Sequence, residues 1–273
     1  MENKRKYEMP RVIASEDELA KALYIANKKM SDMEAKRSEM FANISHDLRA
    51  PLAAINGRLE YLIGELEKDN KNIDVNYMLE SLQMMLQRGK GMEKLIEDIF
   101  LMARLDNAIV NVKLEKVPVA FFLEDYFYMI NEEPKYKDRK IISEIPENLT
   151  QEINIDTEKI TRVLDNLFTN ALKYSNSGDK IILGLKIENQ KAVIYVKDNG
   201  IGIDSDALEK IFERCYKVQE ARTPGAEASY GLGLAIAKSF VELCGGNIRC
   251  ESERFYGTTF YIEFPLCEEG QIN

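Results

Sequence analysis

The chain has few of the residues that build metal sites and disulfide frameworks. It contains one histidine, His46, and four cysteines among 273 residues. The cysteines, at positions 215, 244, 250 and 267, show no CxxC spacing, and together with a single histidine they argue against a zinc site. Four scattered thiols fit a reducing, cytoplasmic compartment.

Long apolar runs and an excess of positive charge are also missing. No apolar run approaches the roughly 20 residues that span a bilayer, and the start MENKRKYEMP lacks the apolar segment of a secretion signal. The net charge of −9 disfavours nucleic-acid binding through bulk positive charge. We therefore expect a soluble chain with no nucleic-acid partner.

Two apolar stripes with helical spacing occupy the first part of the chain. The first stripe consists of Phe41, Ile44, Leu48, Leu52, Ile55, Leu59, Leu62 and Leu66. The second consists of Val75, Met78, Leu82, Met85, Gly89, Met92, Ile96, Ile99 and Ala103. These steps of three and four residues predict two amphipathic helices, and the polar break at 68–74 predicts an antiparallel hairpin. A lone hairpin cannot bury both stripes, so we expect a homodimer that forms a four-helix bundle.

The pattern changes after Leu105. From Val117 onward, short β-like runs such as Lys180–Ile187 and Ala192–Lys197 alternate with amphipathic helical patterns. This mixture predicts an α+β sandwich, with helices on one face of a mostly antiparallel sheet. The predicted parts are an N-terminal helical segment at 1–35, a helical hairpin at 36–106, a linker at 107–116 and an α+β domain at 117–268.

The single histidine lies in the stretch NISHDLRAPL at 43–52, within the first helical pattern. At about 100° per residue, His46 points roughly 160° away from the centre of the apolar stripe, toward solvent. An exposed neutral imidazole is a competent nucleophile, and the carboxylate of Asp47 can accept a proton from one ring nitrogen while the other attacks. Pro51 should bend or loosen the helix. The pattern alone leaves an ordinary surface histidine as the alternative.

Four clusters in the second half suit a nucleotide. In DNLFTNALKY at 165–174, four polar side chains share one helical face. DNGIGI at 198–203 follows a predicted strand, and its glycines permit close backbone approach to a ligand. IFERCYK at 211–217 precedes a polar stretch, Gln219–Tyr230, with the composition of a lid. GLGLAIAK at 231–238 opens a helix whose amides can bind phosphate oxygens, although no P-loop sequence occurs. Each cluster alone has an ordinary structural explanation, but their order favours a binding site.

Taken in this order, the motifs resemble the cytoplasmic kinase core of bacterial two-component sensor histidine kinases. SHDLRAPL resembles the phosphoacceptor box, DNLFTNALKYS the asparagine box, DNGIGI the first glycine box, IFERCYKV the phenylalanine box, and GLGLAIAKSFVELCGG the second glycine box. The resemblance extends from about Met40 to Pro265. It implies a dimerisation and histidine phosphotransfer hairpin, followed by a GHKL-type (Bergerat) ATP-binding domain.

The resemblance also implies a reaction and its site. ATP would phosphorylate His46, with Asp47 as the base that orients and activates it, and the phosphoryl group would pass to an aspartate in the receiver domain of a response regulator. Asn170 would coordinate Mg²⁺. The other implied nucleotide-binding residues are Asn166, Lys173 and Tyr174 on the phosphate and ribose side, Asp198 for the adenine amino group, Gly200 and Gly202 at the pocket floor, Arg214 and Lys217 near the phosphates, and Gly231, Leu232 and Gly233 at the phosphate end.

Three positions depart from the pattern of this family. Ala50 stands where the family usually has threonine or asparagine, a side chain implied to position water during dephosphorylation of the regulator, so we expect weak phosphatase activity. Cys215 replaces the usual aromatic residue, and Ser229 stands where a glycine often begins the second glycine box. Both changes would alter the packing around the lid.

Two other classes of protein compete with this interpretation. The gyrase, mismatch-repair and chaperone ATPases share the implied fold but use a glutamate four residues before the magnesium asparagine, where this chain has Asn166. A non-catalytic dimeric scaffold is the second alternative, and the complete set of implied site residues argues against it. The first 40 residues resemble nothing specific, and a full-length protein anchored in the bacterial membrane through an upstream sensor stays compatible with the sequence.

Overall fold

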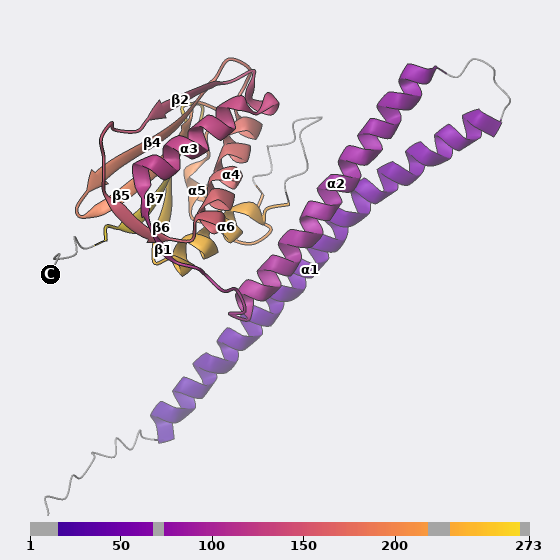
Figure 1. Cartoon of the computed structure of the whole chain (residues 1–273). Helices are drawn as coiled ribbons and strands as arrows, with labels where there is room; N and C mark the ends of the chain where they lie inside the picture. The colour runs from indigo at the N-terminus through magenta and orange to yellow at the C-terminus, as the bar shows by residue number, and fades with distance from the viewer. Residues whose placement is uncertain (1–15, 68–73, 218–229, 268–273) are drawn as a thin grey trace, which may run out of the picture. The chain divides into compact units, whose positions relative to one another are not determined.

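The computed structural model describes residues 16–67, 74–217 and 230–267 (Figure 1). The predicted lid at 219–230, including Ser229 and except for Tyr230, and the predicted polar break at 68–74, except for Asp74, lie outside the described residues. Residues 1–46 and 47–273 form two compact units.

The helices and strands follow one another in two blocks. The helical block consists of α1 (Glu16–Glu67) and α2 (Val75–Asp106). The mixed block consists of β1 (Glu115–Pro118), α3 (Val119–Glu132), a 3₁₀ turn (Pro134–Tyr136), β2 (Lys140–Glu144), β3 (Glu152–Ile155), α4 (Thr157–Tyr174), β4 (Lys180–Glu188), β5 (Lys191–Asp198), α5 (Ser205–Leu208), α6 (Gly233–Leu243), β6 (Asn247–Glu253) and β7 (Gly257–Pro265). This order confirms the predicted α+β class with an N-terminal helical pair.

A helix cap and an aromatic contact stabilise the pair of long helices. Asp74 caps α2, and its side chain accepts a hydrogen bond of 2.9 Å from the amide of Asn76. The rings of Tyr61 on α1 and Tyr77 on α2 meet edge to face at 6.0 Å between centroids. Helix α1 continues through Pro51, so the proline does not end the helix, and the expected loosening stays a prediction.

One copy of the chain does not bury the apolar stripes of α1 and α2. Leu62 and Met85 are buried. The side chains that keep 40–54% of their surface exposed are Leu52, Leu59, Leu66, Leu82 and Ile96. Because these residues recur with helical spacing, the exposed surface is a continuous apolar stripe rather than scattered side chains.

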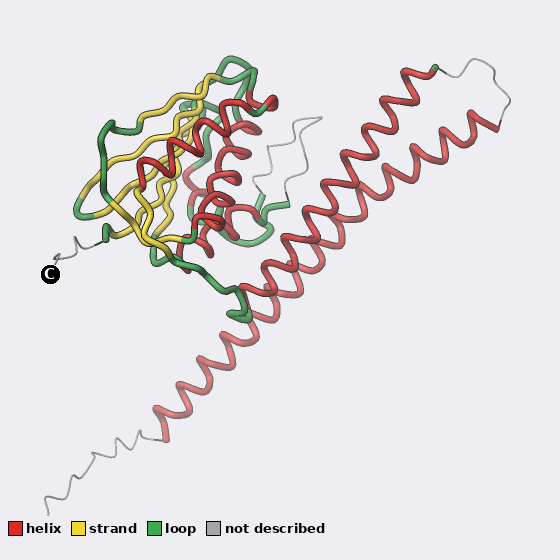
Figure 2. The backbone as a smooth tube through the Cα atoms, in the orientation of Figure 1, coloured by secondary structure: helices red, strands yellow, loops and turns green. Residues whose placement is uncertain are grey.

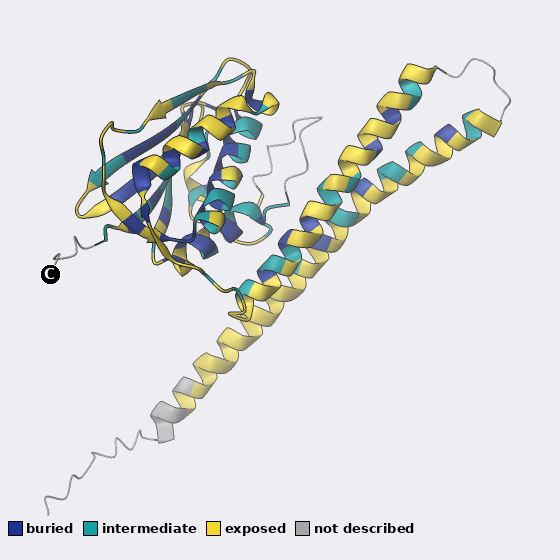
Figure 3. Cartoon of the chain, viewed as in Figure 1, coloured by how far each residue is buried: buried dark blue, intermediate teal, exposed yellow. Residues whose placement is uncertain are grey.

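The strands form a two-stranded and a five-stranded sheet (Figure 2). Strands β1 and β3 pair antiparallel. The larger sheet has the order β2-β4-β5-β7-β6, in which only β2 and β4 are parallel. Helices α3, α4 and α6 cover one face, and their buried residues, dark blue in Figure 3, belong to one core cluster with the buried residues of the strands. This confirms the predicted mostly antiparallel sheet with helices on one face.

The opposite face of the large sheet is covered by its own polar and aromatic side chains. The guanidinium of Arg249 lies 3.8 Å from the ring centroid of Tyr261, and Glu263 pairs with both Arg249 and Lys191 at 3.1 Å. Cross-strand pairs of this kind stabilise a solvated face. The sheet therefore needs no second layer on that side.

Candidate active site

Helix α4 presents the polar row that the sequence predicted. Asn166, Asn170, Lys173 and Tyr174 are all half-buried. The helix begins at the buried cap Asp156, whose carboxylate accepts amide hydrogen bonds from Lys113 at 2.9 Å and Lys159 at 3.1 Å. Burial alone would raise the pKa of this cap, but the amide bonds outweigh burial and lower the pKa. Asp156 therefore fixes the first turn of α4, the helix that carries the polar row.

The end of α4 is joined to the loop after β5. The amide of Ile201 donates to the Tyr174 carbonyl at 3.0 Å, and a Cβ added at Gly200 would collide with the same carbonyl. Arg139 donates to the backbone carbonyl of Ser175 at 2.8 Å and to its hydroxyl at 2.9 Å, so a cation caps the last turn. The asparagine box and the first glycine box thus form one connected wall.

Asp198 is the buried acceptor in this wall. Its side chain accepts the amide of Gly200 at 2.9 Å, and only 5% of the residue is exposed. Burial raises the pKa of Asp198 to about 6, although the amides of Gly200 and Thr258 oppose the rise. Gly202, with φ +70°, lets the loop pass directly over the backbone of Glu253. A ligand that donates an N–H to this carboxylate would replace part of the solvation that Asp198 loses.

The other end of the α4 row meets the start of α6. A Cβ built on Gly233 would lie 3.1 Å from the amide oxygen of Asn166, so the two elements touch at this glycine. Gly231 has φ +73° and packs against the backbone of Cys215 and Tyr216, and the Cys215 amide donates to its carbonyl at 3.0 Å. Leu232, the residue before α6, is buried in the core.

The two cations expected near the phosphates are paired with carboxylates of the long helices. The ammonium of Lys217 lies 2.5 Å from Oδ2 of Asp47, and Arg214 makes a two-pronged ion pair with Asp106. The ring of Tyr230 lies 5.9 Å from the Lys217 ammonium. In this arrangement both cations contact protein carboxylates, so their predicted contact with phosphate stays a prediction.

The predicted exposure of His46 is confirmed. His46 is exposed on α1, and the following residue, Asp47, is half-buried. The hydroxyl of Ser45 donates back to the Phe41 carbonyl at 2.8 Å, which keeps that side chain on the helix surface. The nucleophile candidate is therefore accessible to a reactant.

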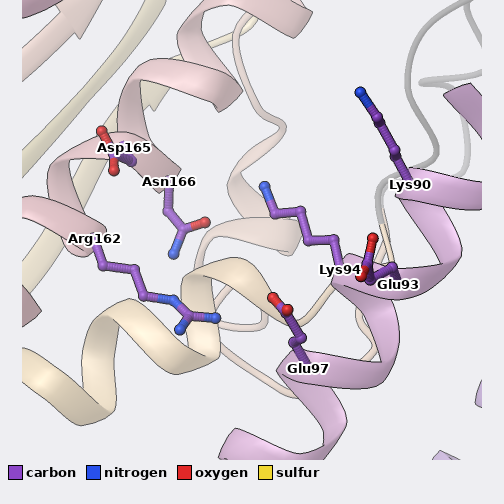
Figure 4. Close-up of a pocket in the computed structure, with 7 residues that line it drawn as sticks. All are labelled: Lys90, Glu93, Lys94, Glu97, Arg162, Asp165 and Asn166. Atoms are coloured by element: carbon purple, nitrogen blue, oxygen red, sulfur yellow. The ribbon is translucent and has the colours of Figure 1, made fainter.

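The sequence interpretation missed Arg162. Its guanidinium donates to the buried carboxylate of Asp98 on α2 at 2.6 Å. Arg162 precedes Asn166 by four residues, so extending the polar row one turn backward would have found it. Between these helices lies a pocket of about 340 Å³, lined by Lys90, Glu93, Lys94 and Glu97 of α2 and by Arg162, Asp165 and Asn166 of α4 (Figure 4).

The donor set at this site fits Mg²⁺ only if phosphate oxygens share the ion. Within residues 16–67, 74–217 and 230–267, no group of three or more His, Cys, Asp or Glu side chains could hold a metal ion. Mg²⁺ commonly takes one or two protein oxygens and completes its octahedron with phosphate oxygens and water. The half-buried amide of Asn170 can supply one such oxygen.

Two family models match successive parts of the chain. Residues 36–108 match the family of His Kinase A (phospho-acceptor) domains. Residues 155–268 match the family of histidine kinase-, DNA gyrase B- and HSP90-like ATPases. Among the described residues, no helix is long and apolar enough to cross a membrane.

Individual proteins agree with these matches. Sensor histidine kinase WalK of Bacillus subtilis strain 168 is 34% identical over 244 residues, which cover 88% of this chain and 38% of WalK. The chain thus spans less than half the length of this relative. Among solved structures, the Acinetobacter baumannii histidine kinase AdeS has a TM-score of 0.61 at 19% identity and covers 81% of this chain and 98% of that one.

A histidine kinase solved together with a regulator has the same fold. The structure of histidine kinase ThkA in complex with response regulator protein TrrA has a TM-score of 0.58 at 20% identity, covering 91% of this chain and 67% of that one. Because both domain families match in order and a sensor histidine kinase is similar over most of the chain, the chain belongs to the two-component sensor histidine kinase family.

Proposed function

We propose that the chain uses Mg-ATP to phosphorylate His46 and passes the phosphoryl group to an aspartate of a response regulator receiver domain. The observation that carries this proposal is the ion pair between Asp47 and Lys217. It joins the residue next to the exposed histidine to the phenylalanine box of the ATPase-like domain. The match to the ATPase family supports ATP as the nucleotide.

The nucleotide would lie along α4. Asp198 would accept the adenine amino group, with Gly200 and Gly202 leaving room for the base, and Lys173 and Tyr174 would line the ribose and phosphates. The N-terminus of α6, at Gly231 to Gly233, would offer amides to phosphate oxygens. Asn170 would hold Mg²⁺, which neutralises phosphate charge when bound.

The chemical step needs one nucleophile and one proton acceptor. A ring nitrogen of neutral His46 would attack the terminal phosphorus, so an N–P bond forms as the P–O bond to ADP breaks. The other ring nitrogen would lose its proton to Asp47, which leaves a phosphohistidine with an uncharged ring and a negatively charged phosphoryl group. Arg214 and Lys217 would have to exchange their carboxylate partners for phosphate, and this exchange would couple nucleotide binding to release of Asp47.

The proposal includes a homodimer and a receiver-domain partner. The exposed apolar stripe of α1 and α2 supports dimerisation, because a second hairpin would bury it. The solved complex of ThkA with the regulator TrrA supports a receiver domain as the partner. A membrane link through an upstream sensor belongs to the same proposal.

Phosphatase activity should be weak because residue 50 cannot position water. Ala50 is exposed and carries no hydrogen-bonding side chain. Restoring a hydroxyl with Ala50→Thr should speed dephosphorylation of the phosphorylated regulator, while autophosphorylation stays near its original rate. An unchanged dephosphorylation rate would contradict this part of the proposal.

Incubation of the purified chain with γ-labelled ATP and Mg²⁺ tests the main proposal. We expect label that is lost in acid and retained in base, as for an N–P bond, and none in His46→Ala. Because His46 is the single histidine, the variant removes every possible phosphohistidine. Nucleotide binding by the wild type without any label would favour the scaffold alternative instead.

A further inference from the structure

The two ends of the polar row on α4 indicate where the two ends of a bound nucleotide would lie. Tyr174 is hydrogen-bonded to the Asp198 loop, whereas Asn166 touches the first turn of α6. Tyr174 follows Asn166 by eight positions, which is a rise of about 12 Å along the helix, roughly the reach from adenine to the terminal phosphate. This step rests on the proposed function, because it uses the proposed placement of adenine at Asp198.

Beyond Asn166, the row opens into the pocket between α4 and α2. Figure 4 shows Lys94 extending from α2 across this pocket toward α4, whereas Lys90, one turn earlier, points away. The next cation on α4, Arg162, is held by the buried carboxylate of Asp98. Lys94 takes part in none of the ion pairs formed within the described ranges. Its ammonium is therefore the cation that can meet a ligand at this end of the row.

The same helix face leads to the neighbourhood of the phosphoacceptor. Gly91 precedes Lys94 by three residues, so both lie on one face of α2. A Cβ built on Gly91 would lie 3.7 Å from the Tyr230 hydroxyl, and the Tyr230 ring lies beside Lys217, which pairs with Asp47. Lys94 is thus one helical turn from the cluster that contains Asp47, and it faces Asn166 on its other side.

We propose that Lys94 is a further catalytic residue, whose ammonium binds the terminal phosphate of ATP and neutralises charge as the phosphoryl group moves to His46. Phosphoryl transfer is accelerated mainly by positioning and by cations placed where charge spreads over the equatorial oxygens. The carboxylates of Glu93, Glu97 and Asp165 also line the pocket, so its cations are balanced in the absence of ligand. Because only the terminal phosphate reaches Lys94, this residue would discriminate ATP from ADP.

Paired affinities for ADP and a non-hydrolysable ATP analogue, both with Mg²⁺, test this role. Lys94→Gln should weaken binding of the analogue about tenfold and leave binding of ADP unchanged, since only the terminal phosphate is contacted. Lys94→Arg keeps the charge and should restore most of the affinity. Lys116→Gln is the control: it removes one positive charge at an exposed position of β1 outside the pocket, so it should behave like the wild type.

A rate measurement adds a second readout. At saturating ATP, Lys94→Gln should label His46 about tenfold more slowly or worse, and its KM for ATP should rise in step with the lost affinity for the analogue. Equal affinities of Lys94→Gln and wild type for the analogue would overturn the proposal. So would a parallel loss of ADP and analogue binding, because that result indicates a structural role. A wild type that never labels, combined with analogue-selective weakening in Lys94→Gln, would contradict the kinase proposal but support the phosphate contact.

Discussion

Replacing Asp198 by asparagine should stabilise the nucleotide-free protein while removing its nucleotide binding. The carboxylate is buried, and burial raises its pKa from the ordinary 3.8 to about 6. A displacement of this size corresponds to about 3 kcal/mol. At pH 7 the folded protein therefore holds a carboxylate that would be more stable in water. Nucleotide binding is the process that would offset this cost.

The sign of the pH dependence follows from proton linkage. Between pH 4 and 6 the folded state binds more protons at Asp198 than the unfolded state, so this residue makes stability fall as pH rises. Above pH 6 both states are ionised, and the loss is complete. Asparagine does not titrate, so the variant should escape the loss. Because its amide replaces one carboxylate oxygen and loses an acceptor, we expect a net gain of about 1–2 kcal/mol at pH 8.

Thermal unfolding of wild type and Asp198→Asn across pH 5 to 8, without nucleotide, measures the effect. The variant should melt about 3–6 °C higher at pH 8, and the difference should shrink toward pH 5. Asp156→Asn is a matched control, since amide bonds lower the pKa of that buried carboxyl. It should be destabilised, most strongly above pH 4. A constant difference between Asp198→Asn and wild type at all pH values would refute the reasoning.

Four further outcomes test other parts of the structure. Affinity for the ATP analogue should rise between pH 5 and 7, because the adenine amino group needs ionised Asp198 as its acceptor. Binding near pH 6 should therefore release a proton. Equal heats of binding in buffers of different ionisation enthalpy would contradict this. Gly200→Ala should cost about 1–3 kcal/mol in chemical denaturation and weaken nucleotide binding, since its Cβ would meet the Tyr174 carbonyl; unchanged values would exclude that collision. Arg162→Ala should lower the free energy of unfolding by about 2 kcal/mol, because it leaves the buried carboxylate of Asp98 without its partner. Asp98→Ala should cost less, because the side chain of Arg162 is 40% exposed and can be solvated. A larger loss in Asp98→Ala than in Arg162→Ala would contradict this account. Leu59→Glu should produce monomers in sedimentation if the exposed stripe forms the dimer interface.

Much of this protein could be predicted from its sequence because local patterns carry the information. Spacing of three and four residues determined the long helices and the exposed face of His46, and alternating apolar residues determined β4 and β5. The asparagine row needed only the helical repeat. Glycines at 200 and 202 indicated close backbone approach, which the structure shows against Tyr174 and Glu253.

The tertiary structure decided which distant charges meet. Lys217 pairs with Asp47 across 170 residues of sequence, and Arg162 pairs with Asp98 across 64. No periodicity encodes such pairs, because they depend on how α2, α4 and the phenylalanine box are brought together by burial of their apolar faces. Burial also decided the raised pKa of Asp198, since desolvation is a property of the surrounding atoms and not of the residue. The sequence therefore determined which groups are present and on which faces, and packing determined their partners and their charge.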